Sequence, residues 1–151
     1  MRSVLYIFAL AVTLCSSALA GEAALITKES KLGVKETIDA LTAALAIKGV
    51  KVVARIDHAT AAKAAGLELR PTEVILFGNP TLGTPLMQAD QRAGLDLPMK
   101  VLAWQNENGK VFITYADPAG LKARYRLDGR DEVLKAMTQA LDAFTAAAMG
   151  R

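Results

Sequence analysis

A hairpin signal in the second half of the chain constrains the fold more than any other feature. The apolar segments 100–105 and 110–116 are separated by a short polar turn that ends in Asn108-Gly109. Asn-Gly readily adopts the backbone dihedrals of a tight antiparallel turn, so the two segments are predicted to pair as strands. Because a hairpin cannot belong to a purely parallel sheet, the sequence predicts a mixed or mostly antiparallel sheet.

The remaining elements follow from the spacing of apolar residues. Residues 34–48 repeat apolar side chains at helical spacing and are followed by Gly49, which favours the conformation of helix ends. Residues 51–57 alternate like a half-buried strand, and Asp57 is the expected N-cap of a short helix. Further expected elements are a strand over 23–28, a strand over 74–77, and helices over 58–65, 85–92 and 130–147. The chain is therefore predicted to form a single compact α+β domain, with about five strands and helices packed on the sheet.

The segment 74–77 is expected at the centre of the core. Its four residues are all apolar, a pattern typical of a strand that is covered on both faces. Four side chains on the predicted helices recur at helical spacing and are expected to pack on the sheet: Leu41, Leu134, Met137 and Leu141.

The first twenty residues have the features of a signal peptide. A short positive start precedes the apolar run 4–14, which is too short to cross a bilayer, and Ala18-Leu19-Ala20 fits the cleavage pattern of signal peptidase. We expect a signal peptide over residues 1–20, a mature domain over 21–151, and a periplasmic or secreted location. No stable membrane anchor is expected after cleavage.

The only cysteine, Cys15, lies within the predicted leader. It does not fit a lipid attachment site, because Leu14 stands where a small residue is required. The mature chain would contain no cysteine, so disulfides and thiolate chemistry are excluded from it.

Charge argues against nucleic acid as a partner. The net charge of the whole chain is +3, and removal of Arg2 with the leader lowers it by one. Both signs are interspersed along the sequence, without the basic patch that a nucleic-acid-binding surface needs.

A loop rich in backbone-special residues follows the central strand. Residues 77–87 hold two glycines and two prolines among uncharged polar side chains, which indicates a shaped surface. Asn79 precedes Pro80 and is therefore held extended, so its amide can serve either the following turn or a ligand. Thr84 is the expected N-cap of the next helix, with Pro85 at its first position.

Several motifs along the chain resemble the domain-of-unknown-function 302 family, in the order that this family shows. The motifs are Ile56-Asp57-His58, Leu69-Arg70-Pro71-Thr72, Phe77-Gly78-Asn79-Pro80, Gly83-Thr84-Pro85-Leu86-Met87, Asp96-Leu97-Pro98-Met99-Lys100-Val101 and Val111-Phe112-Ile113-Thr114-Tyr115-Ala116-Asp117-Pro118. The resemblance runs from about residue 29 to residue 147. It implies a compact α+β domain, often exported or attached to other modules, and it brings no established reaction, cofactor or substrate.

The candidate site gathers polar residues of these motifs. The only histidine, His58, begins a predicted helix, where the helix dipole favours its neutral form; it could bind a ligand or simply fix the strand–helix corner. We expect the domain to bind a small polar or anionic ligand, or a protein partner, without a metal or other cofactor. The pocket is predicted to comprise His58, Asn79, Thr84, Asp96 and Tyr115.

Two other functions and one assembly state stay open. An enzyme would use His58 as general base with Asp96 orienting it. A haem or copper carrier would use His58 and Met87, although the dense methionine or histidine clusters of Cu(I) sites are absent. Catalysis has little other support, because no Gly-x-Ser-x-Gly elbow exists and Ser30 is the only serine beyond the leader. A homodimer is compatible with the sequence.

Overall fold

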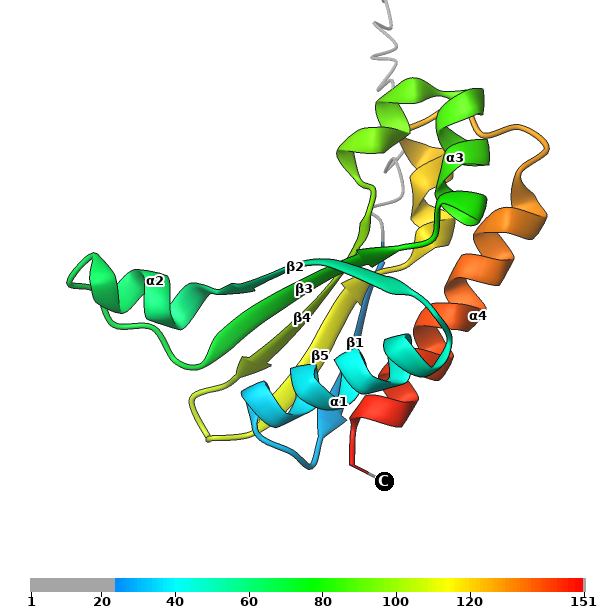
Figure 1. The fold of residues 1–151 in the computed structure, drawn as a ribbon. Coiled ribbons are helices and arrows are strands. Elements are labelled where there is room, and N and C mark those ends of the chain that lie inside the picture. Colours follow the sequence, from blue (N-terminus) through cyan, green and yellow to red (C-terminus); the bar gives the residue numbers. More distant parts are fainter. Residues whose placement is uncertain (1–23, 151) are drawn as a thin grey trace, which may run out of the picture.

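Five antiparallel strands form one sheet in the order β1-β5-β4-β3-β2 (Figure 1). This computed structural model describes residues 24–150, so the predicted leader lies outside the described part. The elements are β1 (Leu25–Ser30), α1 (Val34–Ile47), β2 (Lys51–Asp57), α2 (His58–Ala64), β3 (Thr72–Gly78), α3 (Pro80–Ala89), the 3-10 helix η1 (Gln91–Leu95), β4 (Met99–Gln105), β5 (Val111–Ala116), the 3-10 helix η2 (Pro118–Ala123) and α4 (Asp131–Ala148). The predicted α+β class is confirmed, and every described strand pair is antiparallel.

The predicted hairpin joins β4 to β5. Gly109 has a φ of 77°, which a residue with a side chain rarely adopts. The side chain of Asn106 accepts hydrogen bonds from the backbone N–H groups of Asn108 and Lys110, at 3.0 and 2.9 Å. These bonds fix the turn, and with it the register that sets Leu102 opposite Thr114.

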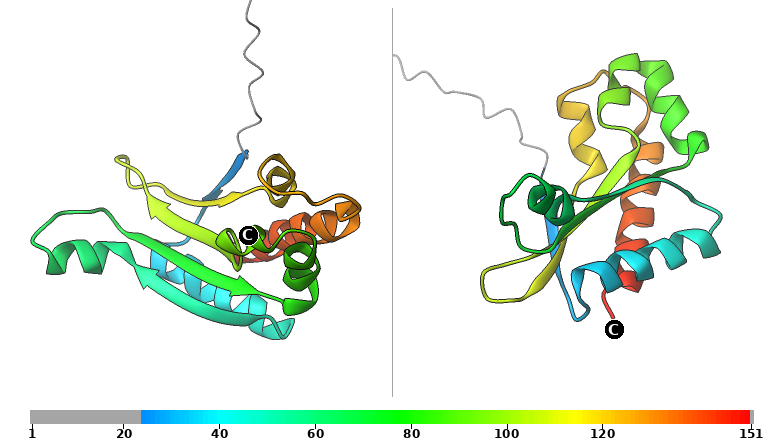
Figure 2. Two further views of the ribbon diagram at one scale, coloured as in Figure 1. Left: turned by 90° about the horizontal axis from the view of Figure 1, so that it is seen from above. Right: turned by 60° about the vertical axis from the view of Figure 1, so that its left-hand side comes forward.

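Helices cover only one face of the sheet. Along β3, Ile75 and Phe77 are buried, whereas Val74 and Leu76 between them are only half buried. α1 and α4 lie on the buried side, and α2 projects beyond one end of the sheet (Figure 2). The expectation that segment 74–77 is covered on both faces is therefore wrong. We call the uncovered side the open face; its central side chains are Val74, Leu76, Leu102, Trp104, Phe112 and Thr114.

The buried side forms the main core. Leu41 on α1 and Leu141 on α4 pack there, as expected, against Ile75 and Phe77. Leu134 and Met137, which were expected on the sheet, instead belong to a second apolar cluster with Leu86, Ala93, Leu121 and Leu127. The first half of α4 extends past the sheet, so its apolar stripe faces α3 and the 3-10 helices.

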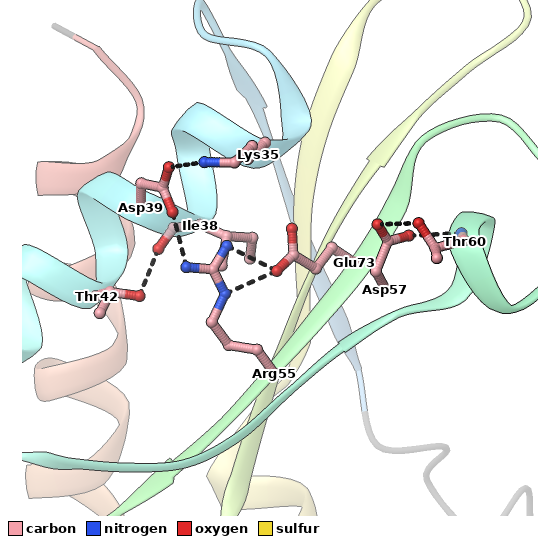
Figure 3. A network of polar contacts seen from close by, with 8 residues as sticks. All are labelled: Lys35, Ile38, Asp39, Thr42, Arg55, Asp57, Thr60 and Glu73. Atoms are coloured by element: carbon pink, nitrogen blue, oxygen red, sulfur yellow. Dashed lines mark hydrogen bonds and ion pairs between the residues drawn. The ribbon is translucent and has the colours of Figure 1, made fainter.

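A charged network fastens α1 to the edge of the sheet (Figure 3). The Arg55 guanidinium on β2 pairs with Asp39 of α1 and with Glu73 of β3, each at 2.7 Å. Glu73 is nearly buried, with a side chain that is 11% exposed, so it needs this partner. The hydrogen bond from Lys35 lowers the pKa of Asp39, with a further contribution from Arg55. In the same view, Asp57 accepts hydrogen bonds from the backbone and hydroxyl of Thr60, which confirms it as the N-cap of α2.

The helix after β3 begins earlier than predicted. Asn79 is the N-cap of α3, because its side chain accepts the backbone N–H of Thr81 at 2.9 Å, and Pro80 takes the first helical position. The prediction of Thr84 as N-cap was wrong, and Pro85 lies inside the helix. The carbonyl that Pro85 leaves without a donor belongs to Thr81, an exposed residue that water can reach.

Phe77 tests the placement of the core. It is 4% exposed, and its ring meets that of Phe144 on α4 edge-on, with centroids 6.2 Å apart. Phe77→Ala should lower the free energy of unfolding by about 3–5 kcal/mol, because a cavity remains where the ring was. Denaturant unfolding measures this loss. Ile47→Ala, at an 82% exposed position, is the control and should change stability by less than about 0.5 kcal/mol. A loss below about 1 kcal/mol for Phe77→Ala would contradict this core.

Candidate functional site

A cavity of about 780 Å³ lies at the end of the sheet where β4 begins and β5 ends. Its walls are mostly apolar, and its polar side chains come from the segments next to these strands. The lining residues are Ala24, Leu25, Asp96, Met99, Lys100, Ala116, Asp117, Pro118, Leu121 and Arg124. A cavity of this size with apolar walls and a few convergent polar groups is typical of small-molecule sites.

Asp96 sits on the wall of this cavity with two partners. Its carboxylate accepts the hydroxyl of Tyr125 at 2.5 Å and pairs with the Arg124 guanidinium at 3.1 Å. The hydrogen bond to Asp96 raises the pKa of Tyr125 above its ordinary value, so the phenol remains a donor at neutral pH. The Arg124 guanidinium also lies 5.9 Å from the centre of the Tyr125 ring.

Asp117 on the opposite side is occupied by the fold. Its side chain accepts the backbone N–H of Ala119 at 3.0 Å, which caps η2, and the hydroxyl of Thr138 at 3.1 Å, which ties η2 to α4. This carboxylate therefore serves the backbone, as such side chains often do after a strand.

Lys100 differs from the other charged groups of the cavity. Its ammonium donates one hydrogen bond, to the backbone carbonyl of Asp96 at 3.2 Å, and no carboxylate within residues 24–150 forms an ion pair with it. An ammonium carries three donors, so two of them remain for solvent or a ligand. Among the cavity's charged groups, Lys100 is the one that no described side chain pairs with or hydrogen-bonds.

A third carboxylate, Asp90, holds the loop that carries Arg124 and Tyr125 beside the cavity. Asp90 has a side chain that is 5% exposed and is paired with Arg92 at 2.7 Å. It also accepts the backbone N–H groups of Arg92 and Arg126, each at 3.1 Å. The hydrogen bonds from Arg92, followed by that from Arg126, hold the pKa of Asp90 well below its ordinary value. Asp90 thereby fixes residue 126, close in the chain to Arg124 and Tyr125.

The five residues expected to form one site do not come together. Asp96 lines the cavity, while Asn79 caps α3 and Thr84 is exposed within the same helix. Tyr115 is buried in the main core, 3% exposed, with the Lys28 ammonium 5.5 Å from its ring centre. His58 is exposed at the start of α2.

His58 lies at the opposite end of the sheet from the cavity. Its neighbour Asp57 pairs with Glu73, whereas the start of α3 follows Gly78, five residues further along β3. At about 3.3 Å per residue, roughly 17 Å of strand separates the two ends. The structure therefore pairs His58 with neither Asp96 nor Met87. No group of three or more metal-ligating side chains of His, Cys, Asp or Glu forms within residues 24–150.

Sequence reasoning missed Lys100, Arg124, Tyr125 and Asp117 as a group. The signal in the sequence was indirect: Asp96 and Asp117 each stand close before a proline, next to a predicted strand end. Such positions favour aspartates that cap turns. These turns line the same cavity because of the register of β4 and β5, which no local pattern specifies.

The roles of Asn79 and His58 can be distinguished by the effect of each substitution on stability. Asn79→Ala removes the cap of α3 and should lower the free energy of unfolding by about 0.5–2 kcal/mol. His58→Ala should change it by less than about 0.5 kcal/mol, because the ring is exposed and makes no hydrogen bond within the described residues. Thermal and denaturant unfolding of both variants provide the measurement. A strongly destabilised His58→Ala, or a neutral Asn79→Ala, would show that these roles are misassigned.

The lowered pKa of Asp90 predicts how stability depends on pH. A carboxyl whose pKa is lower in the folded state stabilises the fold above its unfolded value of about 3.9. That contribution is lost as the pH falls below this value toward the folded pKa. Asp90→Asn should therefore be less stable at pH 7 and should lose less stability between about pH 4 and pH 2.5 than the unaltered chain.

Denaturant unfolding across this pH range checks the prediction for Asp90. Asp128→Asn is the control, since this exposed carboxylate makes no hydrogen bond or ion pair within residues 24–150. Asp128→Asn should lose as much stability between about pH 4 and pH 2.5 as the unaltered chain does. Equal acid dependence in Asp90→Asn would mean that the Asp90 contacts do not stabilise the fold.

Curated relatives match this domain over about half of their own length. The chain is 45% identical over 130 residues to the "Fluoride-specific ion channel FluC 1" of Brucella suis biovar 1 (strain 1330), covering 85% of this chain and 51% of that protein. The match to the protein of the same name from Brucella abortus biovar 1 (strain 9-941) is equally close and covers 48% of it. Among the described helices of the present chain, none combines the length and apolar composition that crossing a membrane requires.

A solved structure and a family model complete the comparison. The crystal structure of an uncharacterised conserved protein from Bacillus stearothermophilus has the same fold, with a TM-score of 0.65. The match is 24% identical and covers 83% of this chain and 94% of that chain. The model of the domain of unknown function DUF302 matches residues 26–144. The resemblance noted in the sequence is thus confirmed: the chain belongs to the DUF302 family.

Proposed function

We propose that this chain is an exported, non-enzymatic domain that binds a small ligand with an anionic group in the cavity beside Lys100. One observation carries the proposal. Asp96 and Asp117 each hold hydrogen bonds of the fold, whereas the Lys100 ammonium pairs with no carboxylate of the described residues and donates only to a backbone carbonyl. A carboxylate or similar anion is the group that satisfies such donors best.

The walls of the cavity favour a ligand with an apolar body. The apolar lining side chains are Leu25, Met99, Pro118 and Leu121. A hydrated inorganic ion would leave most of this apolar surface without a contact. A short aliphatic or aromatic acid would place its carboxylate at Lys100 and bury its body against these side chains. Arg124 adds a second cation, although it already pairs with Asp96.

The structural hydrogen bonds of the carboxylates at the cavity support binding over acid–base catalysis. Acid–base chemistry needs a group that can change its protonation without breaking the fold. Asp96 and Asp117 both hold structural hydrogen bonds, and His58 lies at the other end of the sheet. Export is supported by the signal-peptide features of residues 1–20.

A protein partner is the second candidate function. The relatives named fluoride-specific ion channels are about twice as long as the matched region, so a related domain is joined to further sequence in those proteins. We expect fluoride to bind no better than chloride, because the cavity is far larger than either ion, and thermal unfolding with the sodium salts of both measures this.

Thermal unfolding with matched small molecules tests the proposed ligand class. Hexanoate, 1-hexanol and hexylamine share one apolar chain and differ in charge. Hexanoate should raise the melting temperature most; at ten times its dissociation constant the stabilisation is about 1.4 kcal/mol, or several degrees. Hexylamine should give no shift.

Two variants assign the effect to the cavity. Lys100→Met should abolish the shift caused by hexanoate while the protein stays folded, because the side chain is exposed. Lys48→Met, at an exposed position at the end of α1, should keep the full shift. Equal shifts with hexylamine, or an undiminished shift in Lys100→Met, would overturn the proposal.

A further inference from the structure

The centre of the open face is largely apolar although no described helix covers it. Antiparallel sheets with one solvated face normally carry polar residues on that face. Here Val74, Leu76 and Leu102 occupy its centre, and Trp104 stacks on Phe112 with ring centroids 5.2 Å apart. Polar atoms at the centre are satisfied within the face, since Trp104 donates its indole N–H to Thr114 at 2.9 Å.

The margins of the face are exposed as well. Leu25 on β1 is 69% exposed and Ile56 on β2 is 43% exposed, so apolar surface reaches both edges of the sheet. A contiguous apolar surface of this kind with aromatic residues at its centre is typical of a protein–protein interface. We propose that the open face is the interface of a two-fold symmetric dimer of this chain.

The size of the face suits a second copy. Five strands about 4.8 Å apart, each six or seven residues long, give a projected area of about 500 Å². Side chains roughen this surface, so its accessible area is on the order of the 800 Å² that each partner buries in a standard stable interface. Two flat sheets pack face to face about 10 Å apart, which lets the central side chains of both copies meet.

The charges at the margins are arranged for self-association. Glu29 lies at one end of the face on β1, while Lys100 on β4 and Lys51 on β2 lie at the opposite end. Thr114 stands midway between Glu29 and Lys100 in the register of the sheet. A two-fold axis lying in the interface over Thr114 therefore sets Glu29 of each copy, which pairs with Lys110 of its own chain at 3.1 Å, against Lys100 of the other, and forms both contacts at once.

The dimer does not depend on the proposed ligand. The cavity beside Lys100 lies at one end of the open face and extends from it toward η2. Leu102 and Trp104, at the apolar centre of the face, are not among the residues that line the cavity. Leu25 and Lys100 belong to both surfaces, so an anion bound at Lys100 competes with the Glu29 contact but leaves the apolar centre in place. The same purified chain can therefore bind a ligand and fail to dimerise, or dimerise and bind no ligand.

Sedimentation velocity combined with fluorescence tests the interface. The purified chain, at concentrations from about 1 to 200 µM, should sediment with twice the mass of one chain at the upper end. Trp104 is the only tryptophan, so its emission should shift to the blue as the dimer forms and to the red on dilution. A chain that stays monomeric throughout, or an emission independent of concentration, would overturn the proposal.

Charge variants at the centre of the face locate the contact. Leu102→Glu and Leu102→Lys should each be monomeric, because like charges meet close to the two-fold axis, and an equimolar mixture of the two should recover the dimer. Ile47→Glu, at an 82% exposed position on α1, is the control and should dimerise like the unaltered chain. Circular dichroism confirms folding, and the dilution series of the unaltered chain decides the question if a variant fails to fold. A dimer that persists in both single variants would place the interface elsewhere.

Discussion

The arrangement of the chain depends on one topological constraint: β1 and β2, which are consecutive strands, form the two opposite edges of the sheet. The connection between them must cross the three strands that lie in between, a distance of about 19 Å. α1 makes this crossing with 14 residues, about 21 Å of helix, and contacts β2, β3 and β4 on the way. The crossing fixes which face is buried, and the pairing of Arg55 with Asp39 and Glu73 ties the helix to the edge strand β2.

The alternation of side chains along each strand then decides which residues enter the core and which lie on the open face. Once α1 and α4 occupy one side, Ile75 and Phe77 enter the core and Val74 and Leu76 must face the other way. The apolar run 74–77 of β3 therefore contributes side chains to the open face as well as to the core. The same geometry brings the beginning of β4 and the end of β5 together, where the turns that carry Asp96 and Asp117 enclose the cavity.

The parts predicted from the sequence are those with local causes. The turn before Gly109, the stripe of α1 and the cap at Asp57 each follow from a few adjacent residues. The start of α3 was misassigned because Asn79-Pro80 and Thr84-Pro85 are equally good local starts. The site was mispredicted for a related reason: His58 and Asn79 flank the same pair of strands, but antiparallel pairing sends them to opposite ends. Only the direction in which the two strands pair reveals this, and that pairing depends on contacts between residues far apart in the chain.

The division of charge around the cavity is the reason why we propose binding and not acid–base catalysis. Near the cavity, Asp90, Asp96 and Asp117 each accept hydrogen bonds that hold a turn, a tyrosine or a helix start in place. A carboxylate that gained a proton during a reaction would weaken these bonds in every cycle, because a neutral acid is a poorer acceptor. The Lys100 ammonium has no such duty and could be neutralised by a ligand without disturbing the fold. In the proposed site the acidic groups would maintain the shape of the cavity, and the cations would recognise the ligand.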